Sequence, residues 1–570
     1  MRTKLLLSAA VAAALGAPAF ADVTPPPVPE KNPPVFEPHE ADPEKPEVKP
    51  DLTAEDISNL FNNKEDGAFD ETDGRFNQEA IIFQEGGEEG RNRASIDQEA
   101  STEGLASVEQ RGSNNRASVR QTNTGGPGSD GQFVNPANIA VVDQNGNGNT
   151  ARVRQFDGPT LAGSVTEANS VAIHQYSDAS GSAGTDVNRA EAEQNGSFNV
   201  SVQITQGTAE EGGQNNEAWA LQSGSGNSDI DIAQNFDGNY AEAAQLDTWR
   251  SSIKIEQNGF GIDADNSAVV TQQYGEGLEA HIVQGGGSAG TAGIDNNAAI
   301  LQTGVDNVTA ISQVFDGNTA TADQSGAAND IAIQQGSGFF VENANTADVV
   351  QSGWGNEIDV YQTADGSDAN FATVAQSGES NELIVNQDAG DGGQNFTDVS
   401  QTGFFNDLAV IQVNDGTGLG GANNASVSQS GNENDLNVSQ DGSGNNVLAD
   451  QSGWGNTLAI AQVGDSNFAG ADQSGEYNEL TIVQDGEFNV AWATQSGALN
   501  EGYIEQDGAS NNAELTQTTY GNRAHIFQTN YETGYVADGT NVANVSQTYN
   551  SNQSALVVQY GAANTANISQ

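Results

Sequence analysis

The sequence predicts an all-β protein, a parallel β-solenoid of strand–turn–strand coils with amyloid-like cross-β stacking. Three observations predict this fold. A frame of Asn, Ala, Val and Gln at offsets 0, 2, 4 and 6 recurs from about residue 76 to residue 570. A Gly-centred turn follows each frame. No proline occurs after Pro159, so a stretch of 411 residues keeps every backbone N–H available for a sheet.

Each frame predicts one strand, because alternation over seven residues is typical of a strand with one buried face. The turn glycines permit positive φ without steric cost. The 11-residue period is clearest near the C-terminus, where three residue types keep step. The Gln positions are Gln429, Gln440, Gln451, Gln462, Gln473, Gln484, Gln495, Gln506, Gln517 and Gln528. The Asn positions are Asn434, Asn445, Asn456, Asn467, Asn478, Asn489, Asn500, Asn511 and Asn522. The turn glycines are Gly431, Gly442, Gly453, Gly464, Gly475, Gly486, Gly497 and Gly508.

The size of the side chain at offset 2 alternates between successive units, and this alternation sets the length of one coil. Ala425, Leu436, Val447, Leu458 and Ala469 illustrate the alternation. A small side chain opposite a large one fills a thin core between two facing strands. One coil is therefore two units, or about 22 residues. The 38 units predict about 19 coils, which form a rod on the order of 90 Å long at the β spacing.

The inward Asn and Gln side chains require partners, since an unpaired buried amide costs roughly 1–3 kcal/mol. In a parallel, in-register stack each amide meets its own copy one coil above and one coil below. The sequence therefore predicts amide ladders along the axis. We expect them to mediate self-assembly too, because the chain stops at Gln570, at offset 6 of its last unit, with no polar cap after it.

The first 75 residues differ from the repeats. Arg2, Lys4 and an apolar run precede Ala19 and Ala21, the small-x-small pattern of signal-peptidase cleavage, so residues 1–21 are predicted to be a secretory signal peptide. Residues 22–75 are Pro-rich and acidic, which favours a disordered segment. Thr53 to Asp56 resembles a capping box and favours a short helix there. The segment is interpreted either as a spacer or as an address for a secretion or assembly partner.

The complete frame Gln-x-Gly-x-x-Asn-x-Ala-x-Val-x-Gln, as in residues 110–121, resembles the curlin repeat of curli fibre subunits. The resemblance covers residues 76–570. It implies a secreted subunit that polymerises with itself into extracellular, cell-surface functional amyloid (a fimbrium) in the biofilm matrix of a Gram-negative bacterium. The expected route is Sec, the periplasm and an outer-membrane curli secretion pore, with a nucleator or minor subunit at the surface. The expected roles are adhesion and aggregation.

Charge and composition exclude several other classes. A formal charge of −60 argues against nucleic-acid partners. No later segment is apolar enough for an integral membrane anchor. With no Cys and with the acids scattered over outward offsets, no catalytic, cofactor or metal site is predicted. His174, His281 and His525 fall at outward offsets and are predicted to be plain surface residues.

Two alternatives remain open. Turns such as residues 237–239 and 485–486 offer oxygen ligands, but their spacing favours loose cation screening over dedicated calcium sites. A monomeric acidic adhesin or matrix rod, with cation binding at its surface, would show the same repeats. About −52 of the charge lies on residues 76–570, so we expect like-charge repulsion to slow self-association until salt screens it.

Overall fold

The computed structural model describes residues 78–570 except for fifteen stretches between strands. The predicted signal peptide and the segment 22–75, including its short helix, lie outside the described residues. The stretches not described are 87–91, 100–103, 123–137, 157–168, 178–187, 198, 208–212, 259–265, 286–294, 316, 338–344, 365–368, 391–392, 415–420 and 531–539.

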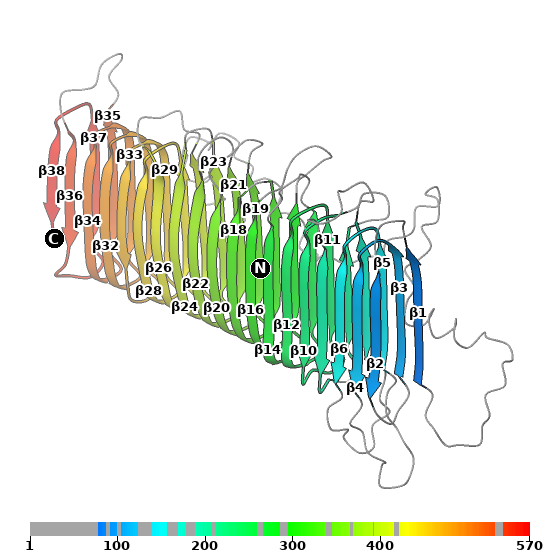
Figure 1. Ribbon diagram of the computed structural model, residues 1–570. Coiled ribbons are helices and arrows are strands. Elements are labelled where there is room, and N and C mark those ends of the chain that lie inside the picture. Colours follow the sequence, from blue (N-terminus) through cyan, green and yellow to red (C-terminus); the bar gives the residue numbers. More distant parts are fainter. Residues whose placement is uncertain are drawn as a thin grey trace, which may run out of the picture. The chain divides into compact units, whose positions relative to one another are not determined.

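The described residues form two parallel sheets of 19 strands each, and successive strands of the chain alternate between the sheets (Figure 1). The odd sheet contains β1 (Gln78–Gly86), β3 (Gly104–Gly112), β5 (Asn138–Asn145), β7 (Ser170–Tyr176), β9 (Ser201–Gln206), β11 (Asp229–Asn235), β13 (Ser252–Asn258), β15 (Glu279–Gly285), β17 (Val308–Val314), β19 (Asp330–Ser337), β21 (Glu357–Ala364), β23 (Glu382–Ala389), β25 (Asp407–Asn414), β27 (Asp435–Asp441), β29 (Thr457–Asp465), β31 (Glu479–Glu487), β33 (Glu501–Ala509), β35 (Arg523–Asn530) and β37 (Ser554–Tyr560).

The even sheet contains β2 (Arg93–Glu99), β4 (Arg116–Thr122), β6 (Thr150–Phe156), β8 (Arg189–Asn195), β10 (Glu217–Ser223), β12 (Tyr240–Trp249), β14 (Ser267–Glu276), β16 (Asn297–Val305), β18 (Thr319–Ala327), β20 (Thr346–Trp354), β22 (Asn370–Glu379), β24 (Asn395–Phe404), β26 (Asn423–Asn432), β28 (Asn446–Trp454), β30 (Phe468–Gln473), β32 (Val490–Ala498), β34 (Asn512–Tyr520), β36 (Val542–Gln547) and β38 (Thr565–Ser569). Each coil thus contributes one strand to each sheet, and the predicted parallel β-solenoid is confirmed.

The coils are longer than predicted over much of the chain. Paired glutamines of neighbouring coils are 22 residues apart between Gln429 and Gln451 but 39 apart between Gln155 and Gln194. The extra residues lie between strands, so the strand register is unaffected: Gln155 still pairs with Gln194. Insertions are tolerated because only the inward frame has to stay in phase with the coil below.

The core lies between the two sheets and shows the predicted pairing of large and small side chains. Ile230 and Ile232 of the odd strand β11 are fully buried, as are Ala241 and Ala243 of the following even strand β12. The same division holds for Leu458 of β29 and its neighbours in the even sheet. Burying one such aliphatic side chain stabilises the fold by about 1.5–3 kcal/mol, so a thin core repeated 19 times is sufficient.

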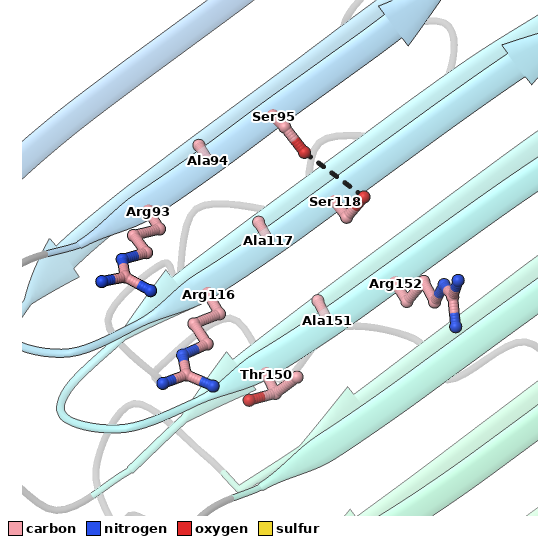
Figure 2. A pocket seen from close by; sticks show the side chains of 9 residues that line it. All are labelled: Arg93, Ala94, Ser95, Arg116, Ala117, Ser118, Thr150, Ala151 and Arg152. Atoms are coloured by element: carbon pink, nitrogen blue, oxygen red, sulfur yellow. Dashed lines mark hydrogen bonds between the residues drawn. The ribbon is translucent and has the colours of Figure 1, made fainter.

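Outward side chains stack into columns along the axis, because the strands pair in register from coil to coil, apart from one shift between Gln273 and Gly275 at the end of β14. Arg93 pairs with Arg116, and Ser95 pairs with Ser118. Figure 2 shows both pairs on the outer face of the even sheet, with the two serine hydroxyls 3.3 Å apart. Any residue at an outward offset therefore has the corresponding residues of the neighbouring coils as its nearest lateral neighbours.

The turn glycines of successive coils pack closely against one another. Gly453 adopts φ of +107°, and a Cβ placed on it would lie 2.0 Å from the carbonyl oxygen of Gly475 in the next coil. Gly336, by contrast, has no atom within 4 Å of the corresponding position. Glycine is therefore required at the stacked turns both by the backbone conformation and by the approach of the next coil.

We predict that Gly453→Ala destabilises the solenoid by about 2 kcal/mol or more, because it combines backbone strain with a steric clash. Gly336→Ala is the matched control and should change stability by less than about 0.5 kcal/mol. Urea unfolding monitored by circular dichroism measures both. Equal midpoints for the two variants would contradict the packing of the glycine turns.

Candidate functional site

The ten glutamines between Gln429 and Gln528 are at most 1% exposed and line the interior of the solenoid. The Nε2 of each donates to the Oε1 of the equivalent glutamine one coil further along, at 2.7–2.9 Å. One ladder follows the even sheet and contains Gln429, Gln451, Gln473, Gln495 and Gln517. The other follows the odd sheet and contains Gln440, Gln462, Gln484, Gln506 and Gln528.

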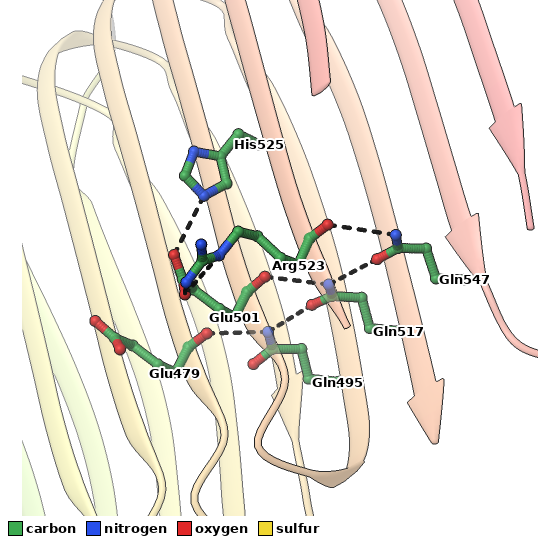
Figure 3. A network of polar contacts seen from close by, with 7 residues as sticks. All are labelled: Glu479, Gln495, Glu501, Gln517, Arg523, His525 and Gln547. Atoms are coloured by element: carbon green, nitrogen blue, oxygen red, sulfur yellow. Dashed lines mark hydrogen bonds and ion pairs between the residues drawn. The ribbon is translucent and has the colours of Figure 1, made fainter. Parts of the chain in front are cut away.

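Each glutamine also binds the opposite sheet, which the repeat pattern did not reveal. Gln495 Nε2 donates to the carbonyl oxygen of Glu479 at 3.0 Å, and Gln517 Nε2 to that of Glu501 at 3.1 Å (Figure 3). Both acceptors begin strands of the odd sheet, 16 residues earlier in the chain. One amide therefore joins three strands, and both of its N–H groups can be satisfied.

The asparagines do more than form ladders. The Oδ1 of Asn434 accepts the backbone N–H of Asn456 at 3.0 Å, while Asn456 Nδ2 donates to the carbonyls of Ser452 and Gly475. The Asn at offset 0 lies where the turn leads into the strand. Its short side chain can therefore hydrogen-bond to carbonyl groups of the turns and to the backbone of the neighbouring coil. All nine predicted asparagines are buried: Asn434, Asn445, Asn456, Asn467, Asn478, Asn489, Asn500, Asn511 and Asn522.

The remaining predicted positions have three different outcomes. The eight turn glycines all adopt positive φ, between +94° and +116°. Gln570 is exposed, accepts a bond from Gln547 at 2.8 Å and donates to the Ser554 carbonyl at 3.3 Å. Ala19 and Ala21 lie outside the described residues. The role of the glutamines and asparagines in self-assembly, and that of Ala19 and Ala21 in signal cleavage, stay predictions.

The prediction that His174 is a plain surface residue is wrong, because the side chain is only 5% exposed. It stands in register with Asp143 and Thr205, and the outward Val141 on β5 is also buried. The outer face of the odd sheet is thus covered here, which an alternation pattern cannot reveal. His281 is half-buried. His525 is half-buried as well, with its Nε2 3.3 Å from Glu501 (Figure 3).

Carboxylates of neighbouring coils approach one another where acids occupy the same outward column. Asp450 pairs in register with Asp472, and Asp485 pairs with Asp507. Partial burial raises the pKa of Asp450, and the adjacent Asp472 raises it further. Partial burial and then Asp507 raise the pKa of Asp485 in the same way. Folding therefore brings together negative charges that the unfolded chain keeps apart.

The regular C-terminal region matches a known family model. The curlin associated repeat matches residues 431–460, 453–486 and 489–518, which include the ladders and glycine turns described above. These residues of the chain are curlin repeats. No curated protein matches its sequence. The curlin repeats and the β-solenoid make the chain a curli-like structural protein rather than a member of a known enzyme family.

Two features are absent from the described part of the chain. It contains no helix long and apolar enough to cross a membrane. Within the same residues, no three His, Asp or Glu side chains are grouped so that they could hold a metal ion.

We predict that Gln462→Leu destabilises the curlin-repeat solenoid by about 3 kcal/mol. The leucine has a similar size but leaves Gln440 Nε2, Gln484 Oε1 and the Asn446 carbonyl without their partner. Ala461→Ser, a polar change at the adjacent outward position, is the control and should be close to neutral. Hydrogen exchange of the surrounding amides measures the local free energy of opening. Unchanged protection in Gln462→Leu would show that the ladder contributes little.

We predict that the solenoid becomes more stable as the pH falls from 7 towards 4. A carboxyl whose pKa is raised by folding binds its proton more tightly in the folded state. The free energy of unfolding therefore rises as the pH passes down through the folded pKa, and the gain is complete below the ordinary value of 3.8.

Asp450→Asn combined with Asp485→Asn should raise stability at pH 7 and flatten this pH dependence. The matched control is Asp323→Asn, which removes a carboxylate flanked in register by Leu301 and Val350. Urea midpoints measured across the pH range decide the matter. A pH dependence that stays as steep in the double variant as in the control would contradict the role assigned to the stacked carboxylates.

Proposed function

We propose that this protein is a secreted structural subunit that assembles with itself into extracellular, curli-like amyloid fibres. The fibres would serve the biofilm matrix, adhesion and cell aggregation. The observation that supports this most strongly is the direction of the glutamine ladders. Every Gln–Gln bond between Gln429 and Gln528 runs from Nε2 of one coil to Oε1 of the following coil.

This common direction makes the two ends of a stack complementary. A coil offers amide oxygens towards the preceding coil and amide hydrogens towards the following coil. A second copy stacked in the same direction would continue both ladders and both sheets with the hydrogen bonds already used inside the chain. A copy stacked in the opposite direction would oppose donors to donors. The proposed fibre is therefore polar, with head-to-tail subunits.

The last described coil supports axial stacking. Ala566 and Ile568 of β38 are inward residues but only half-buried, whereas Ala543 and Val545 in the preceding even strand are at most 2% exposed. A further coil placed against β37 and β38 would cover these apolar side chains. Its contribution is the same apolar burial that stabilises each coil inside the chain.

The likeness to curli subunits supports a proposal for the route and the partners. We propose export through Sec and the periplasm of a Gram-negative bacterium, then passage through an outer-membrane curli secretion pore. A nucleator or minor subunit would start the fibre at the cell surface. We propose no nucleic-acid partner and no integral membrane anchor. Repulsion between the negative charges would slow assembly, and salt would screen this repulsion.

A monomeric acidic rod is the second candidate, and one observation favours it. A single chain already stacks 19 strands in each sheet, so the rod needs no partner to form its core. Such a rod would act as an adhesin or matrix spacer and would bind cations loosely at its acidic surface.

A fibre-formation assay on the purified mature chain separates the two candidates. Fibre formation would give a Thioflavin T response and a diffraction reflection near 4.8 Å from extended filaments. The rate should rise as salt increases from about 10 mM to about 500 mM. Protein that stays monomeric for days would favour the rod.

We predict that Ile568→Asp slows fibre growth at least tenfold, since it places a charge where the next subunit must bury an apolar side chain. Ser569→Asp adds the same charge at the adjacent exposed position and should leave the rate within about twofold. Thioflavin T kinetics with seeds of the unmodified chain measure both. Equal slowing by the two variants would contradict burial of this end.

A further inference from the structure

Every tryptophan of the chain stands beside a glutamate of the next coil. The chain has five tryptophans, and all of them belong to strands of the even sheet. The pairs in register are Trp219 with Glu242, Trp249 with Glu276, Trp354 with Glu379, Trp454 with Glu476, and Trp492 with Glu514. Neighbouring coils are about 4.8 Å apart, so each of these Trp–Glu pairs places a carboxylate next to an indole.

The chain itself contains an example of what such an arrangement binds. The guanidinium carbon of Arg189 lies 4.5 Å from the ring centroid of Trp219. The same guanidinium group is 3.9 Å from Glu191, which stands in register with Trp219 in the preceding coil. Arg250 lies 3.3 Å from Glu276 of the second pair. An indole beside a carboxylate thus holds a cation through a cation–π contact and an ion pair.

The last three Trp–Glu pairs have no basic residue of the chain to play this part. The sequence contains no Lys, Arg or His between His281 and Arg523. Within the described residues, the side chains of Glu379, Glu476 and Glu514 form no hydrogen bond and no ion pair. A chain with a formal charge of −60 attracts cations from solution. These three pairs therefore favour a positively charged ligand.

Two of these pairs belong to one continuous column at the edge where the even strands pass into their turns (Figure 1). From β20 to β28 the residues in register are Trp354, Glu379, Phe404, Asn432 and Trp454. We call these five residues and Glu476 the turn column. Its aromatic rings alternate with polar side chains, so consecutive rings are two coils, or about 9.6 Å, apart.

The rings of the turn column are accessible. Trp354 is 54% exposed and Trp454 is 41% exposed. Beside Trp354, only Ser380 Oγ, at 3.6 Å, lies within 4 Å of a Cβ placed on Gly355. Beside Trp454, the ring of Tyr477 lies 4.9 Å away between centroids and is tilted by 56°. The column therefore offers a row of open aromatic surfaces, which suits an elongated ligand.

We propose that the turn column binds a linear glycan that carries protonated amino groups. The C–H face of a sugar ring packs on each exposed aromatic ring, whose π face is electron-rich. The ammonium group pairs with the adjacent glutamate, as the guanidinium of Arg189 pairs with Glu191 beside Trp219. Asn432 hydrogen-bonds to sugar hydroxyls through its amide. Two sugars of an extended β-linked chain are roughly as long as two coils, so every second sugar lies on an aromatic ring.

The ligand class follows from the combination of ring surfaces and carboxylates. In an amino sugar the ring and the amine are separate parts of one unit, so they occupy the aromatic ring and the glutamate at the same time. An uncharged glycan leaves the carboxylates without a counter-charge, and an acidic glycan is repelled by the chain. A small polyamine satisfies the carboxylates but has no ring to cover the indoles.

The site lies within a single chain, so this inference goes beyond the proposed fibre and does not depend on it. Trp492 and Glu514 add a further pair on β32 and β34. A polymer that reaches several pairs on one molecule binds more tightly than a single sugar, because each later contact forms at a high effective concentration.

The first test titrates the freshly purified full chain with a glucosamine hexamer and follows tryptophan fluorescence. At about pH 6 the glutamates are ionised and the sugar amines are protonated. We expect saturable binding that weakens as salt rises from about 20 mM to about 500 mM. The fully N-acetylated hexamer has no charged amine and should bind roughly fivefold more weakly, or worse.

Two further ligands separate the role of the ring from that of the charge. Equal binding of a glucose hexamer would overturn the role of the amine. Equal binding of a lysine hexamer would overturn the role of the sugar ring and assign the column to basic peptides instead. Preference for the glucosamine hexamer over both supports the proposal.

Removal of the rings tests the position of the site. Trp354→Ala with Trp454→Ala should weaken binding of the glucosamine hexamer roughly tenfold or more, measured by calorimetry. The control, Phe488→Ala with Tyr560→Ala, removes two exposed aromatic side chains from turns that follow odd strands. It should leave the affinity within about twofold. Equal weakening in the two variants would overturn the assignment to the turn column.

Removal of the charges tests the carboxylates without a change in side-chain size. Glu379→Gln with Glu476→Gln should weaken binding roughly fivefold and reduce its dependence on salt. The control, Glu279→Gln with Glu487→Gln, makes the same change in net charge at positions that have no tryptophan in register. Binding as strong and as salt-sensitive in the first variant as in the control would overturn the proposal.

Discussion

The structure depends on one hydrogen-bonding unit, the buried glutamine amide. Between Gln429 and Gln528, each amide accepts a bond from the preceding coil, donates one to the following coil and donates a second to a backbone carbonyl of the facing sheet, as Gln451 does. Because a buried amide without partners costs roughly 1–3 kcal/mol, a coil loses stability when it is out of register with its neighbours. Parallel stacking, fixed register and a common direction along the axis all follow from this requirement.

The other repeated residues conform to the spacing that the amides impose. The carbonyl oxygen of the next coil approaches each turn glycine so closely that no room is left for a Cβ, as at Gly453. The core must be thin enough for an amide to reach the facing sheet, so isoleucine in one sheet faces alanine in the other, as Ile230 and Ala243 do. Loop length is free because no loop takes part in the ladder, which explains coils of 22 to 39 residues.

A fixed register also has consequences on the outside of the molecule. Outward residues become columns, so a charge that recurs in the repeat becomes a line of charge. The acids Asp450 and Asp472 oppose each other in this way, and folding raises the pKa of Asp450. The same geometry gathers the scarce arginines of the first coils into one face and acids of the middle coils into another. The direction of the ladders is thus determined inside the solenoid, and the lines of charge lie on its surface.

The sequence by itself determined the strands, the turns, the inward frame and the two-unit coil, because each repeats in phase and leaves a periodic trace. It also predicted that Asn and Gln would be buried in an ordered stack. Only the tertiary structure decided the third bond of each glutamine, the capping role of Asn456 and the burial of His174. The first two depend on which strand lies across the core or in the neighbouring coil. Residues far apart in the chain meet there, and no local period records their contact.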